Sequence, residues 1–170
     1  MNKSRIFTVI IVLVVVVLGM VACSVPPLAQ SDFNLIFRYG VGAKNELNTF
    51  EGTYTKDMFG DPSITVPLSL TDEELDIIYR KMVEINFFDY PEEFSVTAAP
   101  GEAVGIVTPY SSYYFKVEDD SGIKELRWED KITNEDNEAD RLRELIKLIT
   151  DIIESKEEYQ KLPEPTGGYM

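Results

Sequence analysis

The sequence predicts an α+β domain, in which an antiparallel sheet of about five strands carries two helices packed on one face. Three observations lead to this prediction. Apolar side chains alternate with other residues along several short segments, as in half-buried strands. In two longer segments, apolar side chains recur at helical spacing. The resulting order is strand-strand-strand-helix-strand-strand-helix, and strands joined by turns, with helices following in blocks, favour a two-layer α+β arrangement.

The first half of the body begins with three expected strands. Residues 32–39 predict a strand with one buried face, because large apolar side chains occupy every second position, namely Phe33, Leu35, Phe37 and Tyr39. Two glycines then break the pattern, and residues 48–56 supply the threonine and aromatic side chains of a second strand. A Gly-Asp-Pro turn at 60–62 precedes a short third strand at about 64–68.

The clearest local signal marks the start of the first helix. Thr71 is placed to cap free backbone N–H groups while Glu74 reaches back, which is a capping box, and Leu70 with Leu75 forms a hydrophobic staple. We expect a helix of roughly 15 residues that ends before Pro91. Its buried stripe consists of Leu75, Ile78, Met82 and Ile85.

The second half repeats the plan with a hairpin and a helix. Residues 91–109 predict a long irregular loop, because prolines and glycines interrupt every pattern there. Residues 113–119 and 123–128 predict two strands joined by the turn at 120–122. A helix is expected at about 138–155, and its broad apolar face fits packing on a sheet; that face is Leu142, Leu145, Ile146, Ile149, Ile152 and Ile153.

Composition limits the chemistry that this chain can perform. It has 16 basic and 30 acidic residues and a net charge of −14. That balance argues against nucleic acid, and against an anionic membrane held by a basic patch, because both need clustered Lys and Arg. It favours attraction to a basic partner. Histidine is absent, which removes histidine-dependent nucleophile systems and nearly all zinc sites, so we expect no cofactor and no metal.

The N-terminal segment is the most informative part of the sequence. Residues 6–22 are uncharged and mostly apolar, Lys3 and Arg5 precede them, and the single cysteine, Cys23, follows directly. Seventeen residues lie at the lower limit for a spanning helix. A basic start, an apolar middle and small residues near the end are also typical of a secretory signal peptide. Length alone leaves both interpretations open.

The residues before the cysteine favour the signal peptide. Met20, Val21 and Ala22 lead into Cys23, and this resembles the lipobox of bacterial lipoproteins, although leucine is usual where Met20 stands. The resemblance implies that Cys23 receives a diacylglyceryl group on sulfur and becomes the first residue after cleavage. It also implies an extracytoplasmic location on the cell membrane, and the outer membrane where there are two, because Ser24 rather than Asp follows the cysteine.

The expected domain organisation follows from that cleavage. Residues 1–22 are the signal peptide, 23–32 the lipidated cysteine and a proline-containing tether, 33–162 a single acidic α+β domain, and 163–170 a C-terminal tail. The body resembles small bacterial lipoproteins. Two acyl chains on one cysteine give durable attachment, whereas a single chain is marginal.

Two acidic clusters are candidate sites with plainer alternatives. Glu118, Asp119 and Asp120, together with Glu129 and Asp130, are candidates for the paired carboxylates of a glycoside hydrolase, although hairpin tips usually lie in water. Residues 134–140 place oxygen ligands at alternate positions, as around calcium: Asn134, Asp136, Glu138 and Asp140. That segment lacks the glycine and the terminal glutamate of a calcium loop, which favours acids at a helix N-terminus instead.

The aromatic residues of the hairpin divide between the two faces of its strands. Alternation places Tyr113, Phe115 and Val117 in the core and Tyr114 on the other face. We therefore take Tyr54 and Tyr114 as the candidate exposed contact residues, with Cys23 as the lipid site and no catalytic residue.

The functional expectation is a lipid-anchored, non-catalytic binding module, with an inhibitor or immunity-type protein as one specific version. Its expected partners are the membrane, through Cys23, and a basic protein or another cell-envelope component. The alternative is a carboxylate-dependent hydrolase of cell-wall glycans.

Overall fold

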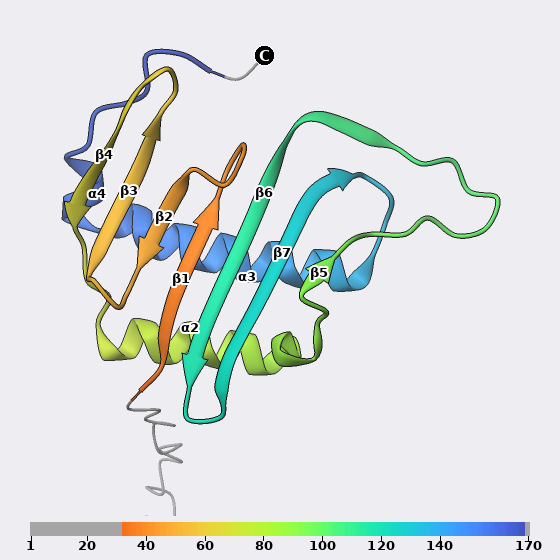
Figure 1. The fold of residues 1–170 in the computed structure, drawn as a ribbon, viewed down its shortest axis with the longest axis horizontal. Coiled ribbons are helices and arrows are strands. Elements are labelled where there is room, and N and C mark those ends of the chain that lie inside the picture. Colours follow the sequence, from red (N-terminus) through yellow and green to blue (C-terminus); the bar gives the residue numbers. More distant parts are fainter. Residues whose placement is uncertain (1–31, 169–170) are drawn as a thin grey trace, which may run out of the picture.

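A seven-stranded sheet with its helices on one face forms the part of the chain that the structure describes, residues 32–168 of a computed structural model (Figure 1). The α+β class is confirmed, whereas Cys23 and the expected signal peptide lie outside the described residues. The strands are β1 (Asn34–Tyr39), β2 (Asn45–Asn48), β3 (Thr53–Met58), β4 (Asp61–Pro67), β5 (Glu93–Phe94), β6 (Ile106–Asp119) and β7 (Gly122–Ile132). The helices are α2 (Asp72–Glu84), α3 (Asn137–Ser155) and α4 (Glu157–Gln160), with a 3-10 turn, η1 (Phe87–Asp89).

The strand order is β4-β3-β2-β1-β6-β7-β5. The first four strands form an antiparallel meander, and the β6–β7 hairpin pairs antiparallel with β1. Only the β5–β7 pair among the described strands is parallel, so the sheet is mixed and not wholly antiparallel as predicted. After β4 the chain crosses beneath the sheet as α2 and reaches the opposite edge, where β5 begins (Figure 1).

The prediction of about five strands and two helices was wrong in its details. The expected second strand is interrupted by a turn at 49–52, in which Gly52 has a φ of +62°, and β2 precedes that turn. Neither β2, with a single apolar residue, nor the two-residue β5 is long enough to show a period. The loop expected at 91–109 is also shorter, because β6 begins at Ile106. The third helix, α4, is a four-residue turn after α3.

Both long helices begin where the sequence predicts. Glu74 N–H donates to the Thr71 hydroxyl at 3.2 Å, and Thr71 N–H donates to the Glu74 carboxylate at 2.8 Å, which completes the capping box. α3 is capped by Asp136, which accepts from the backbone N–H groups of Glu138 and Ala139. Within residues 32–168 no helix is long and apolar enough to cross a bilayer.

The core lies between the sheet and the helices. Strand positions that face the helices are fully buried, among them Leu35, Phe37, Phe115 and Leu126. Ile78 and Met82 of α2, and the predicted apolar stripe of α3, close the core from the other side. No helix of the described part covers the opposite face of the sheet (Figure 1).

The two edges of the sheet differ from its centre. β4, at one edge, contains Pro62 and Pro67, which have no backbone N–H to donate. β5, at the other edge, is two residues long. The C-terminal segment 162–168 returns along the β3–β4 side, where the Thr166 hydroxyl donates to Asp61 at 3.2 Å.

Candidate functional site

The uncovered face carries one row of side chains that crosses five strands. The register places Glu46 of β2 beside Arg38 of β1, Arg38 beside Tyr114 of β6, Tyr114 beside Arg127 of β7, and Arg127 beside Glu93 of β5. Residues paired in this way project from the same face of a sheet. A tyrosine therefore stands between two arginines, with a glutamate beyond each.

Tyr114 contacts both guanidinium groups through its ring. The Cζ atom of Arg38 lies 5.4 Å from the ring centroid, and that of Arg127 lies 5.0 Å from it. Both distances fall in the range of cation–π attraction. Desolvation and the nearby Glu125 carboxylate raise the pKa of the Tyr114 phenol, against the opposing effect of the two arginines, so the hydroxyl stays protonated at neutral pH.

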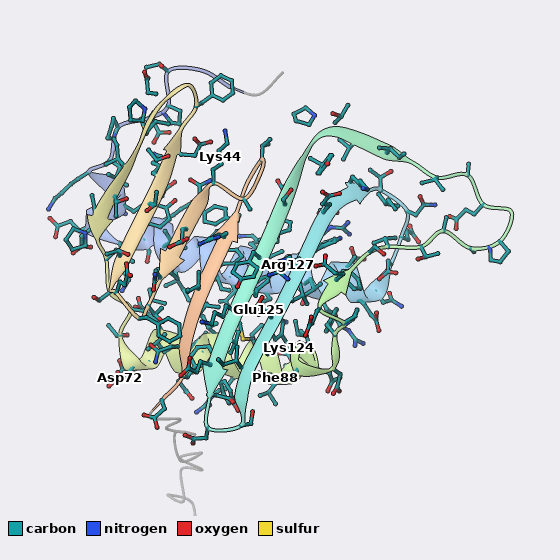
Figure 2. The ribbon with its side chains drawn as sticks, viewed as in Figure 1. Lys44, Asp72, Phe88, Lys124, Glu125 and Arg127 are labelled. Atoms are coloured by element: carbon teal, nitrogen blue, oxygen red, sulfur yellow. The ribbon has the colours of Figure 1, made fainter. Side chains whose placement is uncertain are left out.

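The arginines remain accessible to a partner. Nε of Arg38 lies 2.6 Å from the Glu46 carboxylate, and Nη2 of Arg127 lies 2.7 Å from that of Glu125. Each arginine side chain is nonetheless 48% exposed. Exposed ion pairs of this kind contribute little to stability, so an incoming carboxylate can replace the glutamates at small cost. Figure 2 shows Arg127 and Glu125 together on β7.

A cleft of about 620 Å³ opens at this row. The β1–β2 loop bounds it on one side and β5 on the other, with β6 and β7 between them; the lining includes Arg38, Ala43, Ser95, Tyr114, Arg127 and Lys131. Its volume is within the range of ligand sites. Its combination of tyrosine, tryptophan and arginine is also enriched in protein interfaces.

The prediction that Tyr54 is an exposed contact residue was wrong. Tyr54 pairs with Leu47 and Val66 on the covered face of the sheet and is 1% exposed. The Tyr159 ring of α4 packs on it at 5.5 Å. Its hydroxyl shares a 2.7 Å hydrogen bond with that of Tyr39, which satisfies the polar atom inside the core.

The hairpin aromatics lie as the alternation predicts. Phe115 and Val117 are fully buried, and Tyr113 packs half-buried against the buried Trp128, with ring centroids 5.5 Å apart. Tyr114 is half-buried on the uncovered face. The alternation of these residues between the two faces of the sheet is confirmed.

The acidic cluster of the hairpin is divided between separate structural roles. Asp119 accepts hydrogen bonds from the backbone and hydroxyl of Ser121 and so shapes the β6–β7 turn. Glu129 and Asp130 are neighbours on β7 and project from opposite faces of the sheet. Glu129 pairs with Lys131 on the uncovered face, whereas Asp130 binds α3. These two carboxylates therefore do not face one another.

The acidic segment at 134–140 serves the start of α3. Asp136 is the helix cap, and Asn134 accepts from Gly105 N–H at 3.0 Å and donates to the Ala103 carbonyl. The interpretation of this segment as acids at a helix N-terminus is confirmed. Over residues 32–168 no three Asp, Glu, Cys or His side chains are grouped so that they could hold a metal ion.

Sequence reasoning missed Arg38 and Arg127. A signal for one of them exists, because Glu125, Arg127, Glu129 and Lys131 alternate along β7 as a charged stripe with a period of two. Comparisons with protein-family models, with curated proteins and with solved structures found no match.

Proposed function

We propose that this chain is a lipid-anchored, extracytoplasmic binding module that holds a cell-envelope protein at the cleft around Tyr114. The observation that carries the proposal is the position of Tyr114 between Arg38 and Arg127 on a sheet face that no helix of the described part covers. Tyrosine and arginine are the residue types that most often dominate protein interfaces. The exposed guanidinium groups add two sites for a partner's carboxylates.

The length of the proposed tether is compatible with a cleft that faces away from the membrane. Cys23 lies ten residues before Phe33, and ten residues reach at most ~35 Å. β1 begins beside the β6–β7 turn, where Asn34 pairs with Glu118. Arg38 is four residues further along β1, about 13 Å from that end. A protein anchored through Cys23 would therefore hold the cleft at the end of the sheet away from the lipid.

The distribution of charge supports the inhibitor or immunity-type version with a basic partner. α2 has five acidic and two basic residues, α3 five and three, and α4 two and none, which gives the helix layer a net charge of −7. On β1, β2, β5, β6 and β7 the uncovered face has four basic and five acidic residues, a net charge of −1. The helix layer thus supplies the long-range field that attracts a basic partner, and the cleft supplies the specific contacts.

The experiment is site-specific photo-crosslinking in the native cell envelope. A photo-crosslinking residue is placed at position 114, at position 50 and at position 151 in three separate variants. Phe50 is an exposed ring that lies over Lys116 on the same sheet face, and Asp151 is on the helix layer. We expect one discrete crosslinked protein from position 114, its loss when Arg38→Ala and Arg127→Ala are added, and a weaker yield at high salt.

Three outcomes would contradict the proposal. Equal crosslinking from positions 114 and 50 would remove the cleft as the centre of contact. Crosslinking from position 151 alone would move the interface to the helix layer. Cleavage of cell-wall glycans by the purified chain, with no crosslinked partner, would favour the hydrolase alternative.

A further inference from the structure

Another cavity, of about 370 Å³, lies on the helix side of the sheet near β3. It is an open cavity lined by strands β1 and β3, the end of α3, Tyr159 of α4 and the C-terminal segment. Its polar lining comprises one cation, three carboxylates and several neutral groups, namely Lys56, Asp57, Glu154, Glu164, Tyr39, Asn45, Tyr54, Ser111 and Tyr159. These residues have no part in the cleft around Tyr114.

Lys56 is the unusual member of this cavity. Its side chain is 6% exposed, and its ammonium group lies 3.3 Å from the carboxylate of Glu164 and 5.0 Å from the centre of the Tyr159 ring. An ammonium group has three N–H donors. A buried cation needs close, well-hydrogen-bonded partners to offset its lost hydration, and one oxygen at 3.3 Å on a side chain that is itself 86% exposed is a weak partner.

Two tyrosine hydroxyls line the same cavity as Lys56. The hydroxyl oxygens of Tyr39 and Tyr54 are 2.7 Å apart and share one hydrogen bond. Because each hydroxyl has its own proton, one of the two remains to donate to an acceptor in the cavity. An ammonium and a phenol donor in one small cavity match the two oxygens of a carboxylate.

The C-terminal segment that supplies Glu164 is mostly exposed. Thr166 donates a hydrogen bond to the Asp61 carboxylate, and Gly167 packs so close to the Phe59 ring that an added Cβ would be 2.4 Å from it. The carboxylate partner of Lys56 therefore sits on a segment whose replacement disrupts little of the core.

We propose that the Lys56 cavity is a binding site for a small monocarboxylate, and that Glu164 fills it from the chain's own C-terminal segment until such a ligand arrives. The size of the cavity suits a small organic acid, and Glu154 on its wall would repel a second negative charge. The cavity should therefore prefer ligands with one carboxylate to ligands with two.

The test is a binding titration of the detergent-solubilised full chain with propionate, followed by amide NMR shifts. Propionamide, which is neutral and of nearly the same shape, and succinate, a dicarboxylate, are the ligand controls. We expect the variant Glu164→Gln to bind propionate about fivefold more tightly than the original chain, the factor that the loss of a competing ion pair worth ~1 kcal/mol predicts. Lys56→Gln should abolish binding, and Glu158→Gln, an equal charge change on exposed α4, should leave it unchanged.

Several results would overturn the proposal. One is an equal affinity for propionate in the original chain and in Glu164→Gln. Another is equal binding of propionate and propionamide by Glu164→Gln. Binding of succinate as tight as propionate would overturn the selectivity for a single charge. If Lys56→Gln does not fold, the propionamide comparison decides, because it removes the ligand's charge and leaves the protein intact.

Discussion

The guanidinium group of Arg143 on α3 donates two hydrogen bonds to the carboxylate of Asp130 on β7, at 2.6 and 3.1 Å. The same group lies 5.2 Å from the ring centre of Trp128 and donates to Asp140 at 2.7 Å. Asp130 therefore ties a helix to the sheet, and it raises the pKa of Arg143 further above its ordinary value. Asp130, which the sequence analysis names as a catalytic candidate, therefore has a structural role.

Removing this link should loosen α3 from the sheet. We expect Arg143→Met to lower the free energy of unfolding by about 1–2 kcal/mol, because a bidentate charged hydrogen bond is lost while the apolar stem is kept. Lys147→Met is the matched control: it breaks a pair with Asp151 in which both side chains are well exposed, and it should change stability by less than about 0.5 kcal/mol. Urea unfolding measures both, and equal effects would contradict the role of Asp130.

Glu74 should make the protein sensitive to acid. Partial burial raises the pKa of its carboxyl, but hydrogen bonds from Lys156 and Thr71 outweigh burial and lower the pKa below its ordinary 4.5. A lowered pKa means that the ionised form stabilises the fold above about pH 4.5 and that this contribution is lost as the pH falls through the folded pKa.

The corresponding variant is Glu74→Gln. We expect it to be less stable than the original chain by about 1–2 kcal/mol at neutral pH, because a cap and an ion pair to Lys156 are weakened together. The difference should shrink as the pH falls below 4.5. Glu73→Gln, at the exposed neighbouring position, is the control, and a difference that stays constant with pH would refute the assignment.

The pair Tyr39–Tyr54 should make the protein sensitive to alkali. Burial raises the pKa of Tyr39 to about 12 and raises that of Tyr54 further, because an ionised phenol would lose its hydration inside the core. Raised pKa values mean that this stabilisation is complete below pH 10 and is lost as the pH rises towards 12. Tyr39→Phe should lower stability by about 1 kcal/mol at neutral pH and flatten the decline above pH 10. Unfolding curves measured from neutral pH to pH 12 test this expectation, with Tyr110→Phe as the control.

The proposed lipid attachment depends on a single residue. If Cys23 is acylated, replacing it by Ser should leave an unprocessed precursor and abolish incorporation of labelled fatty acid, because the thiol would carry the lipid and two chains are needed for durable anchoring. Mass spectrometry and metabolic labelling measure both effects. Unchanged mass and labelling would exclude the lipoprotein assignment.

The elements that the sequence predicts best are those with local signals. The capping box at Thr71 and the apolar stripe of α3 are read within one helix, and both appear in the structure. β5 is defined by a neighbour distant in the sequence, since Phe94 pairs with Trp128, whereas β2 lies between two close neighbours, β1 and β3. Strands of four and two residues have too few positions for a periodic pattern.

The candidate site was predictable only in part for the same reason. Alternation along β6 places Tyr114 on the outer face, but it says nothing about which residues of other strands share its row. Arg38 and Tyr114 meet through the register of β1 and β6, a long-range property. The sequence pattern does not assign the face of Tyr54, because β3 begins only after the turn at 49–52 and that turn carries no strong local signal.

The edges of the sheet limit how this protein can recognise anything. An exposed strand edge offers unpaired backbone groups to which a peptide can add as a further strand, whatever its side chains. Here one edge is interrupted by Pro62 and Pro67, and the other is two residues long. The β4 edge is therefore a poor template for a long added strand, whereas β5 covers only Arg127 and Trp128 of the longer strand β7. Self-assembly of copies through their β4 edges is disfavoured, even where many copies are crowded together.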